Sequence, residues 1–278
     1  MTNLSKFKVK NSGIIIIPAR KNSKRIKYKN MMKLAGKPLI EHTILHALKS
    51  KLINEIFVST DCKKIAEFSN NIGVNVVQRP KLISGDKSCT EETLLHVLEY
   101  RQKKGFDEPE FVVLLQCTSP IRDEFDIDNA IKKFKKNSYD SLLSVCENKN
   151  FLWKKDKNNF KPLNYDFNNR KMEQDFKNQY CENGSVYITK TSILKKNRCR
   201  LGGKIGFYEM SYLSSFQVDT YDDVKIIQSL IQSDKKINRE IKLIIFDFDG
   251  VMTDNTALVD SEGKEYVKVS REDGLFLN

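Results

Sequence analysis

Residues 14–30 read I-I-I-I-P-A-R-K-N-S-K-R-I-K-Y-K-N. The run of four isoleucines is apolar and β-branched without interruption, which predicts a strand buried on both faces of a sheet. The residues after it are polar and include six basic side chains between Arg20 and Lys29. Ligands of open α/β sheets bind beyond the carboxyl ends of the strands. The stretch therefore predicts both a buried parallel strand and a binding site for an anionic ligand.

Strand-like and helix-like segments alternate after this stretch. Strands are expected at 14–17, 55–59, 74–78, 111–115, 141–145 and 185–188. Helices are expected at 38–50, 61–70 (with Asp61 as its N-cap), 90–101, 126–136 and 221–232. Repeated βα units with right-handed crossovers predict an α/β fold with a doubly wound, mainly parallel sheet.

The alternation breaks twice along the chain. Residues 147–180 are rich in Asn, Lys and Asp and contain isolated aromatic residues, so we expect a lid, a dimerisation arm or a long loop. A charged segment at 234–240 precedes a new apolar run at 241–246. We therefore expect a first domain at 1–233, a linker at 234–240 and a separate C-terminal segment at 241–278.

The composition limits the kinds of partner. The chain has 278 residues, 40% of them hydrophobic, and a net charge of +12, which suits nucleic acid, a membrane surface or small anionic substrates. No nucleic-acid motif accompanies the charge, and no apolar run approaches the roughly 20 residues that span a membrane. The N-terminal residues also lack a signal-peptide pattern. We expect a cytoplasmic protein that binds neither nucleic acid nor membrane.

Two residue types that often hold metals give no such signal here. The six cysteines are scattered without a C-x-x-C pair, which favours reduced thiols over a zinc site or a disulfide framework. His42 and His46 have the spacing of a helical metal site. They lie opposite the apolar face of the expected helix at 38–50, so we interpret them as solvated side chains.

The pattern I-I-P-A-R-x-x-S-K-x-x-x-x-K-N resembles the opening signature of the acylneuraminate cytidylyltransferases, and the resemblance extends over roughly residues 14–231. It implies a Rossmann-like nucleotide-diphospho-sugar transferase fold. It also implies an enzyme that transfers CMP from CTP to the anomeric hydroxyl of a nine-carbon acidic sugar of the sialic, legionaminic or pseudaminic type, releasing pyrophosphate. The 3-deoxy-manno-octulosonate cytidylyltransferases share a similar opening, echoed by L-A-G-K-P-L at 34–39, and remain an alternative.

The resemblance also implies roles for individual residues on the nucleotide side. Arg20 and Lys29 would hold the phosphates. The remaining nucleotide contacts would come from Ala19, Ser23, Lys24, Asn30, Arg79 and Thr90. Asp219 in V-D-T matches the second aspartate of a D-x-D-T-x-x-D motif and would hold Mg²⁺, while Gln217 replaces the first aspartate.

On the sugar side, L-L-Q-C-T-S-P at 114–120 and N-G-S-V-Y-I at 183–188 resemble the family's acceptor motifs. Gln116 would lie between the sugar and the α-phosphate. The sugar pocket would also contain Ser119, Asn183, Tyr187 and Arg170. Two residues depart from the family pattern. Arg25 stands where a glycine is common, and would add a phosphate contact or change the flexibility of the loop. Glu173 stands where an arginine often meets the sugar's carboxylate, a contact that Arg170 or Lys171 would supply instead.

Residues 244–254, I-I-F-D-F-D-G-V-M-T-D, resemble a different family, the haloacid-dehalogenase phosphatases, especially those acting on 3-deoxy-octulosonate 8-phosphate. The resemblance implies a nucleophile at Asp247 and a general acid/base at Asp249, beside magnesium. Only 38 residues span 241–278, whereas such a domain needs about 100 or more, so we expect a truncated, inactive segment. Three hypotheses remain in order: a cytidylyltransferase that forms a homodimer through 147–180, a phosphatase, and a non-catalytic scaffold suggested by Gln217 and Glu173.

Overall fold

The computed structural model describes residues 13–157, 159–170, 172, 179–237 and 253–269. Contacts along the chain divide it into two units, Met1–Ser233 and Asp234–Asn278. Each unit is described by itself.

The first unit is built on a seven-stranded sheet. Its order is β11-β7-β10-β6-β1-β4-β5. The strands are β1 (Ile14–Pro18), β4 (Ile56–Thr60), β5 (Asn75–Gln78), β6 (Phe111–Leu115), β7 (Ser141–Glu147), β10 (Tyr180–Lys190) and β11 (Ile205–Glu209). Strand β10 runs antiparallel to β6 and β7, whereas the other four pairings are parallel. The predicted α/β class with a mainly parallel sheet is confirmed.

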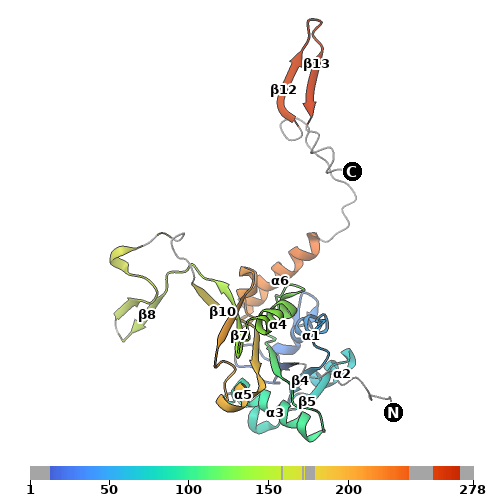
Figure 1. Ribbon diagram of the computed structural model, residues 1–278, viewed down its shortest axis with the longest axis vertical. Helices are drawn as coiled ribbons and strands as arrows, with labels where there is room; N and C mark the ends of the chain where they lie inside the picture. The colour runs from blue at the N-terminus through green and yellow to red at the C-terminus, as the bar shows by residue number, and fades with distance from the viewer. Residues whose placement is uncertain (1–12, 158, 171, 173–178, 238–252, 270–278) are drawn as a thin grey trace. The chain divides into compact units, whose positions relative to one another are not determined.

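Six α-helices accompany these strands in the described part of the chain, and the last of them, α6, follows β11 (Figure 1). They are α1 (Leu39–Leu48), α2 (Lys63–Ile72), α3 (Thr90–Lys103), α4 (Asp126–Lys136), α5 (Thr191–Asn197) and α6 (Tyr221–Ile237). A short hairpin, β2 (Lys33–Leu34) and β3 (Lys37–Pro38), precedes α1. Helix α6 continues to Ile237, through residues that we expected to form a linker.

The core explains why four isoleucines occur together in β1. Ile15 and Ile17 pack in a cluster with apolar residues of α1, α2 and α4. Ile14 and Ile16 face the opposite way and pack with residues of α3 and α5. All four are completely buried, and each such side chain contributes about 1.5–3 kcal/mol to the hydrophobic stabilisation. The predicted burial of this strand on both faces is confirmed.

Two local expectations are wrong. Helix α2 begins at Lys63, and Asp61 does not cap it; its carboxylate instead accepts the backbone N–H of Lys21 at 2.7 Å. His42 and His46 are partly buried. Burial lowers the pKa of His46 to about 3, and a ring nitrogen of His42 lies 2.9 Å from the carbonyl oxygen of Leu34. Neither histidine is a simple solvated side chain.

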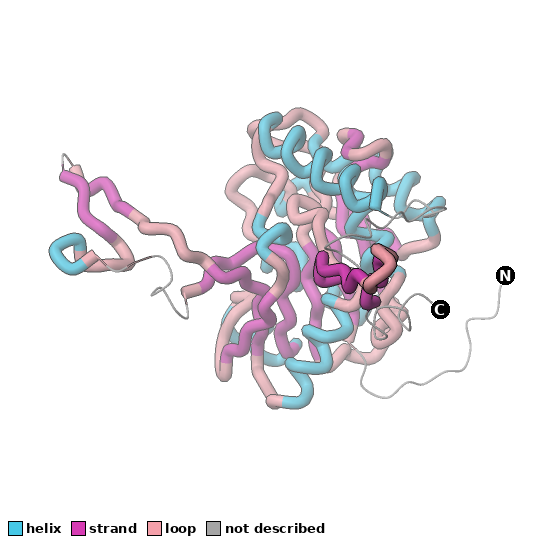
Figure 2. Tube along the Cα trace, turned by 90° about the horizontal axis from the view of Figure 1, so that it is seen from above, coloured by secondary structure: helices cyan, strands magenta, loops and turns pink. Residues whose placement is uncertain are grey.

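The segment at 147–180 contains a small hairpin. Strands β8 (Trp153–Asp156) and β9 (Asn159–Pro162) form a two-stranded antiparallel sheet, which lies apart from the central sheet in both views (Figures 1 and 2). Trp153 and Phe160 are 51% and 65% exposed. The Arg170 guanidinium lies 4.3 Å from the centre of the Phe151 ring. This segment therefore presents aromatic side chains to its surroundings.

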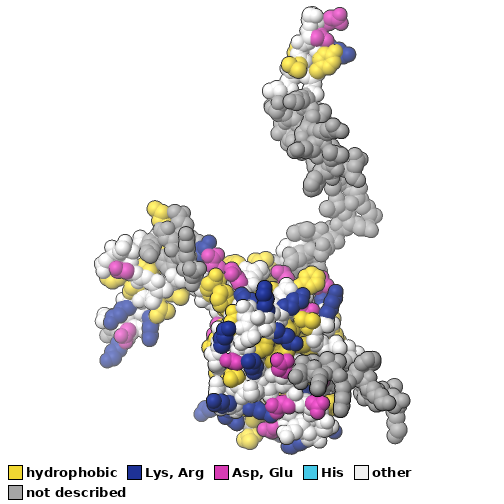
Figure 3. Space-filling view, in the orientation of Figure 1, with side chains coloured by type: hydrophobic (Ala, Val, Ile, Leu, Met, Phe, Trp, Pro, Cys, Tyr) yellow, Lys and Arg dark blue, Asp and Glu magenta, His cyan; other side chains and the backbone are white. Residues whose placement is uncertain are grey.

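Beyond the end of α6, the described residues of the second unit form one hairpin, β12 (Thr253–Val259) with β13 (Glu265–Val269). The strand expected at 241–246, Asp247 and Asp249 lie outside the described residues. Among the helices of the described ranges, none combines the length and the apolar character needed to cross a membrane. On the visible face of the first unit, Lys and Arg side chains alternate with acidic and apolar ones (Figure 3).

Candidate active site

A cavity of about 480 Å³ opens at the end of β1, where the order of the strands in the sheet reverses. Strand β1 pairs with β4 on one side and with β6 on the other, which makes the end of β1 the topological switch point where α/β sheets bind ligands. The cavity is lined by the loop after β1, the segment between β5 and α3, the end of β6 and Asp219, two residues before α6. Four segments distant in sequence therefore meet at one site.

Nine of the expected site residues line this cavity. They are Arg20, Ser23, Lys24, Lys29, Asn30, Arg79, Thr90, Gln116 and Asp219. Together they comprise nearly all of the expected nucleotide contacts, the expected metal ligand and one residue of the expected sugar pocket.

The remaining expected residues do not line this cavity. Ala19 and Ser119 are completely buried, and the Ser119 hydroxyl donates to the backbone carbonyl of Asn183 at 3.0 Å. The side chain of Asn183 is itself engaged by protein atoms, donating to Ser214 Oγ at 2.9 Å and accepting from Ser144.

Tyr187 and Arg170 also have partners elsewhere. The Tyr187 hydroxyl donates to Glu182 at 2.8 Å, while Arg170 stacks on Phe151. Glu173 lies outside the described residues. Of the expected sugar contacts, the structure thus places only Gln116 at this cavity.

Arg20 joins two of the cavity walls. Its Nη1 donates to the carbonyl oxygen of Gly85 at 2.9 Å and lies 3.2 Å from a carboxylate oxygen of Asp86. The carbonyl of Arg20 accepts a hydrogen bond from the side-chain amide of Asn30 at 2.9 Å. These contacts fix the loop after β1 against the loop before α3.

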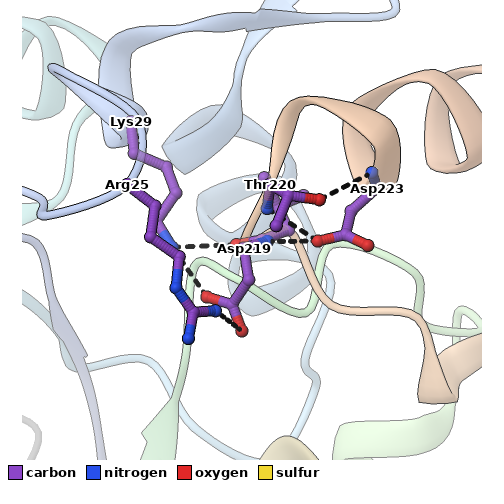
Figure 4. Close-up of polar contacts among 6 residues, drawn as sticks. Arg25, Lys29, Asp219, Thr220 and Asp223 are labelled. Atoms are coloured by element: carbon purple, nitrogen blue, oxygen red, sulfur yellow. Dashed lines mark hydrogen bonds and ion pairs between the residues drawn. The ribbon is translucent and has the colours of Figure 1, made fainter.

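Lys29 joins the first loop to the far end of the unit (Figure 4). Its side chain is 12% exposed, and its Nζ donates to the carbonyl of Val218 at 2.8 Å and to Asp219 at 3.1 Å. Arg25 approaches the other carboxylate oxygen of Asp219 at 3.6 Å. Asp219 is thus held between two cations at the cavity wall.

The start of α6 positions Asp219. The carboxylate of Asp223 accepts the backbone N–H groups of Asp219 and Thr220 at 2.9 and 2.7 Å (Figure 4). Burial alone would raise the pKa of Asp223, but these N–H donors hold that pKa below its ordinary value. Asp223 therefore caps the N–H groups at the start of α6, and Asp219 is the carboxylate of this segment that lines the cavity.

The cavity favours a polyanion. Five cationic side chains and two carboxylates line it, an excess of three positive charges. Burial lowers the pKa of Arg79 to about 10, so this guanidinium remains charged at neutral pH. It is fixed by a 2.7 Å hydrogen bond to the carbonyl of Ser59. Burial raises the pKa of Cys117 to about 12, so this thiol is protonated and is not a nucleophile.

The residues fit a divalent cation only in part. The described residues contain no cluster of three or more His, Cys, Asp or Glu side chains that could hold a metal. Asp219 is a single carboxylate beside a cavity suited to phosphates. Mg²⁺ typically binds one or two carboxylates, keeps several waters and completes its shell with substrate phosphates. The chemistry of this wall fits a cation that arrives with a phosphorylated ligand.

One contact at the cavity was not foreseen from the sequence. Gly184 has a φ of +66°, and a Cβ atom there would lie 2.9 Å from Gln116 Oε1 and 2.9 Å from Gln217 Nε2. The position therefore requires glycine both for its backbone and for the space that the two amides occupy. The one sequence signal for the nearness of Gln217 to Gln116 is the apolar Val218 between two polar residues. If Val218 points into the core, Gln217 and Asp219 point away from it.

Comparison with known proteins supports this interpretation of the site. The chain is 29% identical over 266 residues to N-acylneuraminate cytidylyltransferase A of Danio rerio, a match that covers 93% of this chain and 60% of that protein. It is 33% identical over 218 residues to N-acylneuraminate cytidylyltransferase of Streptococcus agalactiae serotype III, covering 76% of this chain and 51% of that protein. The chain thus spans 51–60% of the length of these curated relatives.

The fold has solved counterparts. A CMP:2-keto-3-deoxy-manno-octonic acid synthetase complexed with CTP superimposes with a TM-score of 0.59 at 16% identity, covering 81% of this chain and all of that one. This likeness supports the nucleotide-diphospho-sugar transferase fold. Residues 14–243, well over half of the chain, match the profile of a family described as cytidylyltransferase. The resemblance seen in the opening signature is confirmed, and the chain belongs to the cytidylyltransferase family.

Proposed function

We propose that the chain is a nucleotidyltransferase that transfers CMP from CTP to the anomeric hydroxyl of a nine-carbon acidic sugar and releases pyrophosphate. The observation that carries this proposal is the cavity at the switch point, where Arg20 and Lys29 of the loop after β1 converge with Arg79 of the loop after β5. Two relatives named N-acylneuraminate cytidylyltransferase support the choice of sugar class.

In this reaction the anomeric oxygen forms a bond to the α-phosphorus, while the bond from that phosphorus to the bridging oxygen of the β-phosphate breaks. The hydroxyl proton passes to solvent, and the electron pair leaves with pyrophosphate. Catalysis of such transfers rests on positioning and on charges that offset the developing negative charge. Arg20 and Lys29 supply these charges. Gln116, at the end of β6, orients the attacking hydroxyl without adding negative charge.

We also propose that Mg²⁺ is the cofactor and that Asp219 holds it. When bound, a divalent cation offsets charge on the phosphate oxygens and on the leaving group. In the described structure Asp219 is held by Lys29 and Arg25. A nucleotide would offer these cations phosphate oxygens in its place and so release the carboxylate for the metal.

The sugar is the open part of the proposal. Sialic, legionaminic and pseudaminic acids share the acidic nine-carbon frame, and 3-deoxy-manno-octulosonate remains the alternative acceptor. The test incubates the chain with CTP, Mg²⁺ and each acid in turn and follows pyrophosphate release. UTP and ATP serve as nucleotide controls. Equal release from UTP or ATP would contradict the preference for CTP, and no release with any acid would reject the proposed reaction.

We propose further that the chain acts in the cytoplasm as a homodimer joined through the segment at 147–180. The exposed Trp153 and Phe160 of the β8–β9 hairpin are the kind of aromatic surface that protein interfaces bury. The measurement is the molar mass by light scattering at micromolar concentration, where the mass of a single chain would reject this part of the proposal.

The motif around Asp247 and Asp249 supports a haloacid-dehalogenase-like segment at 241–278, for which we propose no phosphatase activity. A phosphoaspartate mechanism needs a cation and further carboxylates beside its nucleophile, and the later lysine and acidic motifs of that family are absent from 241–278. Hydrolysis of a sugar phosphate that an Asp247→Asn change abolishes would contradict this.

A further inference from the structure

Two side-chain amides meet at the edge of the cavity. Gln116 lines the cavity, and its Oε1 lies 2.9 Å from the point that a Cβ of Gly184 would occupy. The Nε2 and Oε1 atoms of Gln217 lie 2.9 and 3.1 Å from the same point. The two amides are therefore neighbours across the bare backbone of Gly184, on the side of the cavity where β6 and β10 end their pairing.

The surrounding backbone holds this arrangement in place. The N–H of Val218 donates to the carbonyl of Thr118 at 2.7 Å, and the side chain of Val218 is completely buried. Because side chains alternate along an extended chain, the flanking residues Gln217 and Asp219 face away from the core. Asp219 lines the cavity, and the Gln217 amide lies beside Gly184, near that of Gln116.

A buried arginine fixes the other side. Arg122 Nη2 donates to the carbonyl of Gln116 and to the carbonyl of Ser185, both at 2.9 Å. These acceptors belong to the residue that carries one amide and to the residue after Gly184. The positions of the two amides are thus set by hydrogen bonds that do not involve the amides themselves.

Neither amide has a hydrogen-bond partner within the described part of the chain, although both side chains are partly buried. Neither amide is among the fully buried side-chain atoms that lack a partner in the described residues, so both are accessible to solvent. Two adjacent, accessible amides held in place by the surrounding backbone can therefore exchange water for hydrogen bonds to a polar ligand.

We propose that Gln217 determines specificity for the acidic sugar: with Gln116 it forms an amide pair, and its Nε2 donates a hydrogen bond to an oxygen of the sugar beside the α-phosphate. This inference rests on the proposed function and adds a residue to it. Gln217 stands where the family pattern has an aspartate. An amide donates to an anionic acceptor, whereas a carboxylate at the same place would repel it.

The test is Gln217→Glu, which keeps the size of the side chain, removes the donor and adds a negative charge. Gln102→Glu on the exposed face of α3 is the matched control. For each protein we would measure the KM of the accepted sugar, the KM of CTP and kcat, together with the Kd of CTP by calorimetry without sugar. Melting temperatures verify that each variant is folded.

For Gln217→Glu we expect the sugar KM to rise about tenfold or more, since a site built to hydrogen-bond a substrate group discriminates strongly when the bond is lost. The Kd of CTP should change by less than about twofold, because the triphosphate contacts are elsewhere in the cavity. Gln217→Asp should likewise raise the sugar KM. This variant separates a sugar contact from a metal ligand, because a metal-ligand role would instead lower the Mg²⁺ concentration needed for half-maximal rate.

Each outcome decides between the alternatives. If wild type turns over and Gln217→Glu has the sugar KM of the control, the inference is wrong while the proposed function stands. A loss of CTP affinity as large as the loss of sugar affinity would also overturn it, because position 217 would then act on the nucleotide. If wild type forms no CMP-sugar from any acid, the proposed function fails and the inference fails with it.

Discussion

Replacing Lys29 with Met should remove most of the activity while the first unit stays folded. Methionine keeps the length and the apolar stem of the lysine but has no charge and no donor. The ammonium now makes two hydrogen bonds from a side chain that is 12% exposed. The change therefore removes one cation from the cavity and two contacts from the fold.

The two losses have different sizes. Hydrogen bonds of charged groups are worth about 1.5–3 kcal/mol, but Asp219 is about half exposed, and pairs in contact with solvent contribute about 1 kcal/mol or less. The bond to the carbonyl of Val218 dominates, so we expect unfolding to become easier by about 2 kcal/mol. Loss of one preorganised donor to a developing charge costs about 10²–10³ in kcat.

The assay compares pyrophosphate release with thermal unfolding for wild type, Lys29→Met and Lys27→Met. Lys27 is an exposed lysine of the same loop that does not line the cavity, and its substitution controls for net charge. We expect Lys29→Met to be folded at the assay temperature and slowed by at least two orders of magnitude. A rate within a few fold of Lys27→Met would refute the assignment of Lys29 to the phosphates. A rate loss that occurs only where the protein is already unfolding would refute it as well.

Three further predictions concern the metal, pH and assembly. Asp219→Asn should lower kcat by at least about tenfold and shift the Mg²⁺ titration to higher concentration; a titration identical to wild type would show that Asp219 is not the ligand. Because the pKa of His46 is lowered from 6.5 to about 3, only the unfolded chain takes up a proton on this residue between about pH 6.5 and pH 3. The free energy of unfolding should therefore fall by about 1 kcal/mol between pH 6.5 and 5.5, and a His46→Gln variant, measured by urea titration, should lose most of that slope; an unchanged slope would contradict the burial of His46. Trp153→Asp in the β8–β9 hairpin should yield a single-chain mass in light scattering, with Lys157→Asp in the same hairpin retaining the dimer; two dimers would exclude the hairpin as the interface.

The sequence predicted what depends on local pattern. Four consecutive isoleucines predict a strand buried on both faces of a sheet. The basic residues that follow them directly must then lie at the carboxyl end of that strand. The fold class and the phosphate side of the cavity follow from these two facts. Strand β11 was not foreseen because I-G-F-Y-E at 205–209 is short and half exposed, and its pairing with β7 is decided by tertiary contacts.

The sugar side was harder to predict because its geometry depends on contacts between segments that are distant in the sequence. Asn183 matches a motif residue, yet its side chain holds Ser144 and Ser214 together and does not line the cavity. Gln217 looked like a departure that weakens a metal motif. Its nearness to Gln116 depends on a glycine in left-handed conformation and on the hydrogen bond from Val218 to Thr118. The spacing of residues within one segment cannot predict contacts between residues of different segments.

The bond between Lys29 and Val218 joins residues 189 positions apart. During synthesis, the loop that carries Lys29 leaves the ribosome long before Val218 is made. A nascent chain therefore has the cations of the site without the hydrogen bond that holds Lys29 in place. The cavity is therefore complete only after the residues that precede α6 have packed against the loop after β1. A nucleotide bound where Lys29 meets Val218 and Asp219 would hold the first and last parts of the unit together. It would raise the free energy of unfolding of the unit by mass action. A bound nucleotide would therefore also stabilise the fold, and its removal would lower the free energy of unfolding of the unit.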